Sequence, residues 1–188
     1  MIGLKRGLVK LEPYQEKWRN EAKQTIADLK SLLGDTAVDI QHIGSTAIPA
    51  IHAKPIIDIA VGVCDLKDII PFIPLLENHN YIYRGEDAAE QILFVKGDFE
   101  RDIRTHHVHV VRWNGSQWNN YLNFRDYLNT FPEKAMVYDA CKRRLAGKFP
   151  KDRKRYTEGK QEMISKYLSE AELWKSNRKK SLDKQSVE

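Results

Sequence analysis

The 188-residue sequence has little cysteine and no long hydrophobic run. Its two cysteines, Cys64 and Cys141, lack the Cys-X-X-Cys spacing of metal and redox motifs, so we expect free thiols. No apolar stretch approaches the roughly 20 residues that cross a bilayer, and the N-terminal segment lacks the apolar core of a signal peptide. We therefore expect a soluble, cytoplasmic protein with no membrane partner.

Internal repeats and low-complexity linkers are also lacking, and the length suits one domain that buries about 70% of its unfolded surface. Hydrophobic periodicity predicts helices over residues 16–33 and 65–78, the second interrupted by Pro71 and Pro74. From Ser116 onward the pattern is helical, with breaks near Phe131 and around residues 147–151. We expect a single domain over residues 1–174 and a disordered basic tail over residues 175–188.

Charge is unevenly distributed along the chain. Residues 141–188 hold 15 Lys and Arg against 7 Asp and Glu, whereas residues 1–140 hold 16 against 19. A solvated helix face explains part of this surplus, and an anionic small ligand or nucleic acid could explain the rest. We do not expect nucleic acid as a partner, because KRRLAGKFPKDRKRY interleaves only Phe149 and Tyr156 with its basic residues.

One carboxylate interrupts an otherwise apolar strand. Residues 56–63 are rich in β-branched side chains, which predicts a strand buried on both faces, and Asp58 lies within it. Burying an isolated carboxylate costs several kcal/mol unless a cation, N–H donors or a metal ion accompanies it. From the strand alone, Asp58 could belong either to a structural ion pair or to a metal site.

The turn before this strand suggests an anion site. Gly44, Ser45 and Thr46 follow the apolar stretch 38–43 and predict a turn that opens a helix. Backbone N–H groups and hydroxyls at such a turn can bind phosphate, although Ser and Thr are also ordinary helix N-caps. Lys54 could reach a phosphate at this turn or pair with an acid. Together with Asp58, the turn predicts a two-part site for phosphate and metal.

Further strands are predicted over residues 81–84, 92–95 and 105–111, the last two joined by a polar hairpin segment. His107 and His109 share one face of the last strand, because side chains alternate. With Asp58 on a neighbouring strand they would form a two-His, one-carboxylate set, which suits iron, manganese, zinc or nickel better than magnesium. Contact with phosphate, or half-exposed histidines without a role, are the alternatives.

The stretch HIGSTAIPAIHAKPIIDIAV, residues 42–61, resembles the signature of the GrpB family of predicted nucleotidyltransferases, and HHVHVV, FRDYLN and KRRLAG continue the resemblance over roughly residues 8–170. The resemblance implies an α/β (α+β) nucleotidyltransferase-like fold, a mixed β-sheet backed by helices with a helical C-terminal third. Nucleotidyltransferases of this fold usually carry a second carboxylate two residues after the first. This chain has Ala60 there, which leaves two magnesium ions only one carboxylate to share.

The resemblance extends to four residues of the C-terminal helices: Arg125, Lys142, Tyr156 and Lys160. It implies that they hold a triphosphate or an acceptor against the sheet, because phosphoryl chemistry depends mainly on positioning and charge neutralisation. For each residue taken singly, a surface ion pair with a nearby acid is the simpler interpretation.

The sequence therefore favours a metal-dependent nucleotidyltransferase-like protein that transfers a nucleotidyl group from a nucleoside triphosphate, or uses another phosphorylated small molecule. The candidate catalytic and metal-binding residues are Asp58, His107 and His109, and the candidate nucleotide-binding or phosphate-binding residues are Gly44, Ser45, Thr46, Lys54, Arg125, Lys142, Tyr156 and Lys160. The cofactor would be Mg²⁺ or Mn²⁺, or a transition metal if the histidines ligate. The alternatives are a non-catalytic module that binds a nucleotide or coenzyme A-like ligand and a metal-dependent phosphoester hydrolase.

Overall fold

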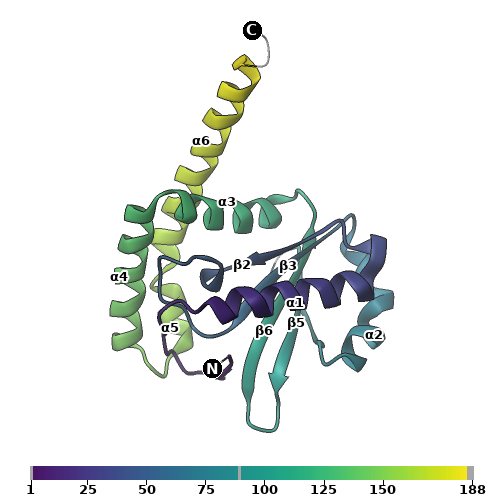
Figure 1. Cartoon of the computed structure of the whole chain (residues 1–188). Helices are drawn as coiled ribbons and strands as arrows, with labels where there is room; N and C mark the ends of the chain where they lie inside the picture. Colours follow the sequence, from purple (N-terminus) through teal and green to yellow (C-terminus); the bar gives the residue numbers. More distant parts are fainter. Residues whose placement is uncertain (1, 89, 186–188) are drawn as a thin grey trace.

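The computed structural model describes residues 2–88 and 90–185, which form a six-stranded mixed sheet backed by helices (Figure 1). The strands are β1 (Leu4–Lys5), β2 (Asp39–Ile43), β3 (Ile57–Val63), β4 (Ile82–Ala88), β5 (Gln91–Asp98) and β6 (Ile103–Arg112). Their order is β2-β3-β6-β5-β4, and β1 pairs with β6. The central pair β3 and β6 is parallel, whereas the other pairs are antiparallel.

The described part of the chain also holds six α-helices and three short 3-10 helices, the latter at residues 34–36, 45–47 and 66–72. The α-helices are α1 (Glu16–Leu33), α2 (Ile73–Asn78), α3 (Ser116–Thr130), α4 (Pro132–Lys148), α5 (Arg153–Glu158) and α6 (Gln161–Gln185). The mixed sheet and the helical C-terminal third agree with the fold predicted from the sequence. Among the described residues, none of the helices combines the length and the apolar character that crossing a membrane requires.

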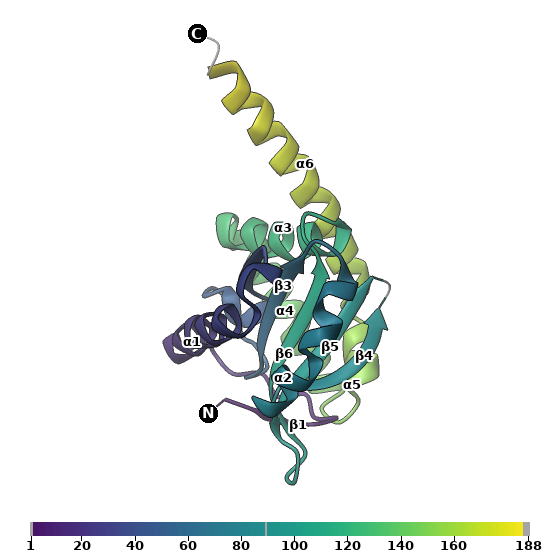
Figure 2. The ribbon, with the colours of Figure 1, turned by 90° about the vertical axis from the view of Figure 1, so that its right-hand side faces the viewer.

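The last helix differs from its sequence-based prediction. Helix α6 runs without a break for 25 residues to Gln185, where a disordered tail from residue 175 was expected. Figures 1 and 2 show its C-terminal half projecting away from the rest of the chain. At 1.5 Å per residue the helix is about 37 Å long. Residues 186–188 lie outside the described part of the chain.

Local sequence explains where the N-terminal helices begin and end. Helix α1 buries Trp18, Ala22, Leu29 and Leu33 along one stripe, and it stops at Gly34, whose φ of 52° suits a residue without a side chain. The segment 65–78 is split as its prolines predict. A 3-10 helix carries Pro71, and α2 follows with proline in its first turn.

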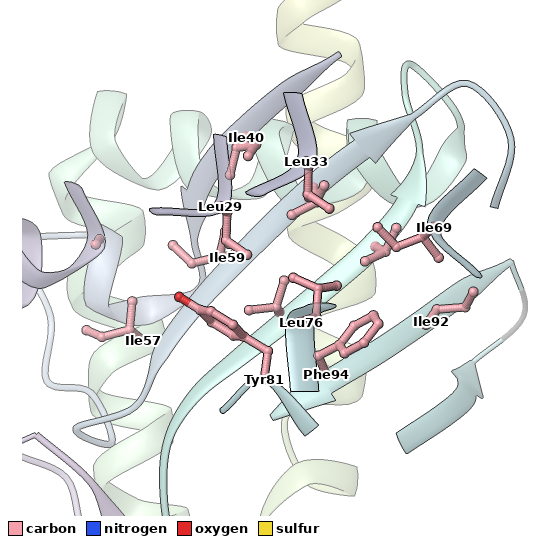
Figure 3. Close-up of a cluster of buried hydrophobic side chains, with 14 of the residues drawn as sticks. Leu29, Leu33, Ile40, Ile57, Ile59, Ile69, Leu76, Tyr81, Ile92 and Phe94 are labelled. Carbon is pink, nitrogen blue, oxygen red and sulfur yellow. The ribbon is translucent and has the colours of Figure 1, made fainter. Parts of the chain in front are cut away.

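The main core lies between the sheet and helices α1 and α2 (Figure 3). Strands β3, β5 and β6 direct alternate side chains into it, among them Ile59, Phe94 and Val108, which are at most 2% exposed. Complete burial of each such side chain contributes about 1.5–3 kcal/mol. Because this face takes one set of alternating residues, the other set on β3 and β6 is directed to the opposite face.

Helices α3, α4 and α6 form a second apolar cluster on that opposite side, together with the segment after the 45–47 turn. Its buried members are Ile48, Ile51, Tyr127, Leu128, Ala135, Tyr138, Tyr167 and Ala171. Helix α3 packs against β2, β3 and β6 as well as against α6. The cluster therefore fixes the C-terminal helices over the sheet while leaving room between them.

Candidate functional site

A cavity of about 540 Å³ lies between the sheet and the C-terminal helices. It is lined by ten of the residues that the sequence analysis singled out: Gly44, Ser45, Thr46, Lys54, Asp58, His107, His109, Lys142, Tyr156 and Lys160. They are far apart in sequence, since they come from the turn after β2, from β3 and the segment before it, from β6, from helices α4 and α5, and from the turn between α5 and α6. A volume of this size is typical of sites for small ligands.

One wall of the cavity carries a group of metal-binding side chains. In the parallel pairing of β3 and β6, Asp58 is in register with His107, and Ala60 with His109. Asp58 Oδ1 lies 3.0 Å from His107 Nδ1 and 3.6 Å from His109 Nε2. One ligand atom from each of the three residues lies within 4.8 Å of the others.

This donor set fits one ion with mixed nitrogen and oxygen ligands. Two imidazoles and one carboxylate are typical ligands of iron, manganese, zinc and nickel. Ala60 is fully buried, and its partner in register, His109, supplies the donor next to the place where a second carboxylate would be expected. The side chains do not fit a pair of magnesium ions, because among the described residues Asp58 is the only carboxylate on the cavity wall. His109 Nδ1 is buried and has no hydrogen-bond partner among the described residues.

Asp58 is held in its charged form. Burial favours the neutral carboxyl, but hydrogen bonds from His107 and His109 outweigh it and keep the pKa of Asp58 well below its usual range. The side chain is 29% exposed, and it lines the cavity. Neither lysine nor arginine forms an ion pair with it among the described residues. The interpretation of Asp58 as half of an internal lysine or arginine pair is therefore excluded within that part of the chain.

The turn after β2 meets Asp58 directly. Gly44 has a φ of 73°, and a Cβ added there would lie 2.6 Å from Asp58 Oδ2. A side chain at this position would be strained by the backbone and would collide with the carboxylate. Ser45 begins the 3-10 turn that the sequence predicts, and it faces the cavity. Glycine here therefore allows the turn and the acid to line one hollow.

The side chain of Thr46 stabilises the turn. Its side chain is fully buried, and its Oγ1 is 2.9 Å from His42 Nε2 and 3.4 Å from the carbonyl oxygen of Ile56. Burial lowers the pKa of His42 to about 4, so this imidazole is neutral at physiological pH. The hydroxyl of Thr46 orients the turn, and a direct role for it in phosphate binding has no structural support.

The opposite wall of the cavity is basic, and Lys142 is its most buried member. The side chain is 1% exposed, and its ammonium group donates to the carbonyl oxygen of His52 and lies 3.5 Å from Ser45 Oγ. Burial lowers the pKa of Lys142 to about 7, although Asp139 partly opposes the shift. A surface ion pair, the simpler interpretation from sequence, is wrong for this residue.

Lys54, Tyr156 and Lys160 form a second basic group in the same cavity. The ammonium groups of Lys54 and Lys160 lie 5.6 Å and 4.7 Å from the centre of the Tyr156 ring. Burial, with repulsion from Arg153 and Lys160, lowers the pKa of Lys54 to about 8, and burial also lowers the pKa of Lys160. These lysines gain less from the ring than they lose in hydration, so an anionic ligand would stabilise their charged forms.

Arg125 does not line this cavity. Its guanidinium donates to Gln41 Oε1 and to the carbonyl oxygen of His42, each at 2.9 Å, and to Asp126 at 2.8 Å. These bonds tie α3 to β2, and the side chain lies in a separate groove next to α1. The role in phosphate binding that the resemblance implied for Arg125 is not supported by its position.

Several residues of the site were not predicted from the sequence. Asp139 on α4 accepts from the backbone N–H of His52 at 2.7 Å and pairs with its imidazole at 2.9 Å, which fixes the loop that carries Lys142's partner. Tyr138 and Arg153 also line the cavity. Helical spacing offered a signal, because Tyr138 precedes Lys142 by four residues and Arg153 precedes Tyr156 by three.

Comparisons with known proteins give a consistent result. Residues 8–170 match the family described as GrpB protein. Glutamate-rich protein GrpB of Alkalihalophilus pseudofirmus is 37% identical over 173 residues, which covers 90% of this chain and 99% of that protein. UPF0157 protein YqkA of Bacillus subtilis is 35% identical over 88% of this chain, which spans 48% of YqkA. The crystal structure of conserved protein GrpB from Enterococcus faecalis has a TM-score of 0.80 and 31% identity over 88% of this chain and 99% of that one.

Proposed function

The chain belongs to the GrpB family, and from this membership and its cavity we propose that it catalyses metal-dependent transfer of a nucleotidyl group from a nucleoside triphosphate to an acceptor. One observation carries the proposal. A converging set of metal-ligand atoms and three lysines with weakened affinity for protons line the same cavity, on opposite walls. Charges of both kinds around one hollow match what a metal-bound polyphosphate requires.

Asp58, His107 and His109 would hold the divalent ion. A bound ion supplies neutralisation of charge on the phosphate that is transferred. The set favours Mn²⁺ or a similar transition metal over Mg²⁺, because two of the three ligand atoms are imidazole nitrogens. In the proposed reaction, an acceptor hydroxyl attacks the α-phosphorus and loses its proton to water, the bond from the α-phosphorus to the oxygen bridging to the β-phosphate breaks, and pyrophosphate leaves.

Lys54, Lys142 and Lys160 would bind the phosphate chain, and Ser45 would donate a hydrogen bond at the Gly44 turn. Each lysine is already desolvated, so little hydration remains to be lost when a phosphate arrives. Lys142 is additionally held by the His52 carbonyl, which keeps its ammonium group at the turn. These residues contribute charge and position rather than covalent chemistry.

Ala60 favours a second candidate function. With one carboxylate instead of two, the site offers less negative charge to a metal pair, and it could bind a metal-loaded nucleotide or a coenzyme A-like ligand without turning it over. The same metal triad and lysines serve this function. Turnover, rather than binding, separates the two candidates.

The metal part is tested by titrating the protein with Mn²⁺, following the free ion by electron paramagnetic resonance. We expect one ion per chain, and Asp58→Asn should weaken its binding about 100-fold or more, because it removes the only anionic ligand. The matched control is Asp35→Asn, an exposed carboxylate between α1 and β2. Equal affinity in Asp58→Asn and the control would refute the metal site.

The nucleotide part is tested by calorimetry with ATP and by pyrophosphate release over a panel of acceptors. The Ser45→Ala and Lys54→Ala double variant should bind ATP about tenfold or more weakly, as expected when charge-assisted hydrogen bonds to phosphate are lost. Metal-dependent pyrophosphate release with one acceptor would identify a transferase, and release into water alone would identify a hydrolase. Tight ATP binding without release would identify the binding module.

A further inference from the structure

A second, smaller pocket of about 220 Å³ lies beside the metal triad on the same side of the sheet. It is lined by four arginines and three other side chains: Arg6, Arg84, Arg104, Arg153, Leu93, Val95 and His107. His107 and Arg153 also line the large cavity, so the two hollows adjoin.

Arg104 is the buried centre of this arginine pocket. The residue is 9% exposed, and its Nη1 has no hydrogen-bond partner among the described residues. It forms an ion pair with Asp102, whose Oδ1 lies 3.5 Å from Nη2. Burial lowers the pKa of Arg104, and the charges of Arg84, Arg6 and Arg153 lower it further. A buried guanidinium with a free donor and three like charges around it is costly unless an anion joins the group.

An irregularity in the sheet aims Arg104 at the pocket. The pairing of β5 with β6 shifts between Lys96 and Gly97, so that Lys96 opposes His106 while Gly97 opposes Arg104. The extra residue in β6 reverses the alternation of side chains beyond it. Without the shift, Arg104 would lie on the same face as His106, in the core. The bulge therefore places a charge next to His107.

The aromatic ring of Phe99 supports the arginines without satisfying them. The guanidinium carbons of Arg104 and Arg84 lie 4.4 Å and 5.4 Å from the centre of this ring. Stacking on a ring orients a guanidinium and leaves its edge available. Phe99 provides no hydrogen-bond acceptor in the plane of either group. Phe99 thus holds two guanidinium groups near one ring, and the unpartnered Nη1 of Arg104 can donate to a planar or tetrahedral oxyanion.

We propose that the arginine pocket binds the phosphate group of a second substrate, a small phosphomonoester that acts at the metal site. Arginine binds phosphate oxygens through paired N–H donors, and several arginines match its two negative charges. The pocket is below the size range of sites for whole small molecules, so it takes one group while the remainder extends toward His107. The identity of the second substrate rests on the proposed function, but phosphate binding itself does not.

The experiment titrates the protein with inorganic phosphate and follows the Nε–Hε signals of its arginines by nuclear magnetic resonance. We expect the Arg104 and Arg84 signals to shift and saturate together. Arg101 serves as the internal control, because it is an exposed arginine of the same hairpin, 3.6 Å from Asp98. A shift of Arg101 equal to that of Arg104, or an unmoved Arg104 signal, would overturn the proposal.

Variants then separate this pocket from the lysine cavity. Arg84→Gln removes an exposed side chain, so the fold is retained, and phosphate affinity at the Arg104 signal should fall about tenfold. Arg101→Gln should leave it within about twofold. The Ser45→Ala and Lys54→Ala double variant should also leave it unchanged. Loss of the Arg104 response in that double variant would assign the phosphate to the lysine cavity and refute a second subsite.

Competition identifies the source of the phosphate. Glucose 6-phosphate, as a small phosphomonoester, should displace inorganic phosphate from Arg104, whereas glucose should not. A 5′-phosphorylated oligonucleotide should compete no better than this small ester. Tighter competition by the oligonucleotide would overturn the assignment to a small molecule and favour a nucleic-acid end. Because none of these readings needs metal or turnover, they remain informative if Asp58→Asn shows that the metal site is absent.

Discussion

The two faces of the central sheet come from the same strands and differ in almost every physical property. The face toward α1 and α2 packs into an apolar core, whereas the face toward the C-terminal helices carries an acid and two histidines and borders three lysines and an arginine pocket. His106 and His107 are adjacent on β6 and illustrate the difference. His106 hydrogen-bonds Thr25 of α1 at 3.2 Å, and His107 bonds Asp58.

The difference shows how one fold can tolerate buried charged groups. Apolar burial on one face stabilises the fold and offsets the destabilising effect of the desolvated lysines and the unpartnered arginine donor on the other side. Stability and ligand binding are thereby assigned to alternate residues of the same strand. Substitutions on the two faces should accordingly change different measured quantities.

The largest effect on stability should come from the core face. Phe94→Ala removes a fully buried ring and should lower the free energy of unfolding by about 3–5 kcal/mol, measured by urea denaturation. Its neighbour Leu93 is half-buried in the arginine pocket, and Leu93→Ala should cost less than about 2 kcal/mol. Equal costs for both would mean that the faces do not differ as described.

The next largest effect is a difference in Mn²⁺ affinity between variants of the two adjacent histidines. His107→Ala should weaken Mn²⁺ binding about 100-fold, because it removes a ligand atom, while His106→Ala should change it by less than about threefold. The measurement is the same metal titration used for Asp58. Similar losses in both variants would show that metal affinity reflects general damage to β6.

A smaller effect concerns the pH dependence of stability on the core face. Burial, followed by the charge of Lys96, lowers the pKa of His106 to about 4 from 6.5, so between these values the unfolded chain binds a proton that the folded chain does not. Stability contributed by the neutral imidazole is therefore complete above pH 6.5 and is lost as the pH falls toward 4, by up to about 1.4 kcal/mol per pH unit.

Urea unfolding at pH 7, 6 and 5 checks this dependence. His106→Gln should lose less stability on acidification than the wild type, and the remaining loss should include the contribution of His42, whose pKa burial lowers to about 4. His79→Gln, an exposed residue at the end of α2, is the control and should follow the wild type. Parallel curves for all three proteins would contradict a buried neutral His106.

The smallest effect is proton uptake on the site face. The pKa values of Lys142 and Lys54 are lowered to about 7 and about 8, and a bound polyphosphate would raise them. ATP binding at pH 8 should therefore take up a proton, at most about one per lysine. Calorimetry in Tris and in HEPES should give different apparent enthalpies, and Lys142→Met should reduce that difference. Identical enthalpies in the two buffers would contradict ligand contact with these lysines.

Elements with strong local signals were predictable from the sequence. Helix α1 begins at Glu16 and ends before Gly34 as its periodicity and its glycine indicate, and the proline pair splits the segment 65–78. His107 and His109 share one face of β6 because alternation in strands is a local rule, whereas their meeting with Asp58 depends on the register of β3 with β6. The turn at Gly44 was predicted from residue types. Its close approach to the Asp58 carboxylate, which leaves no room for a Cβ, depends on tertiary structure.

Features set by distant contacts were not predictable. Arg104 reaches the site face because of a bulge in the pairing of β5 with β6, which residue types did not indicate. Arg125 matched a family segment, but the direction of its side chain depends on how α3 crosses β2. From the sequence, Lys142 resembled a surface residue. It is buried because it lines a cavity that several elements form together, and the sequence did not indicate that cavity.

The most direct test of the account is a crystal structure of the protein with Mn²⁺ and a non-hydrolysable ATP analogue, with the metal located by anomalous scattering. We expect one manganese peak among Asp58, His107 and His109, and phosphate oxygens within hydrogen-bond distance of Lys54, Lys142 and Lys160. A manganese peak elsewhere, or phosphates bound outside this cavity, would contradict it.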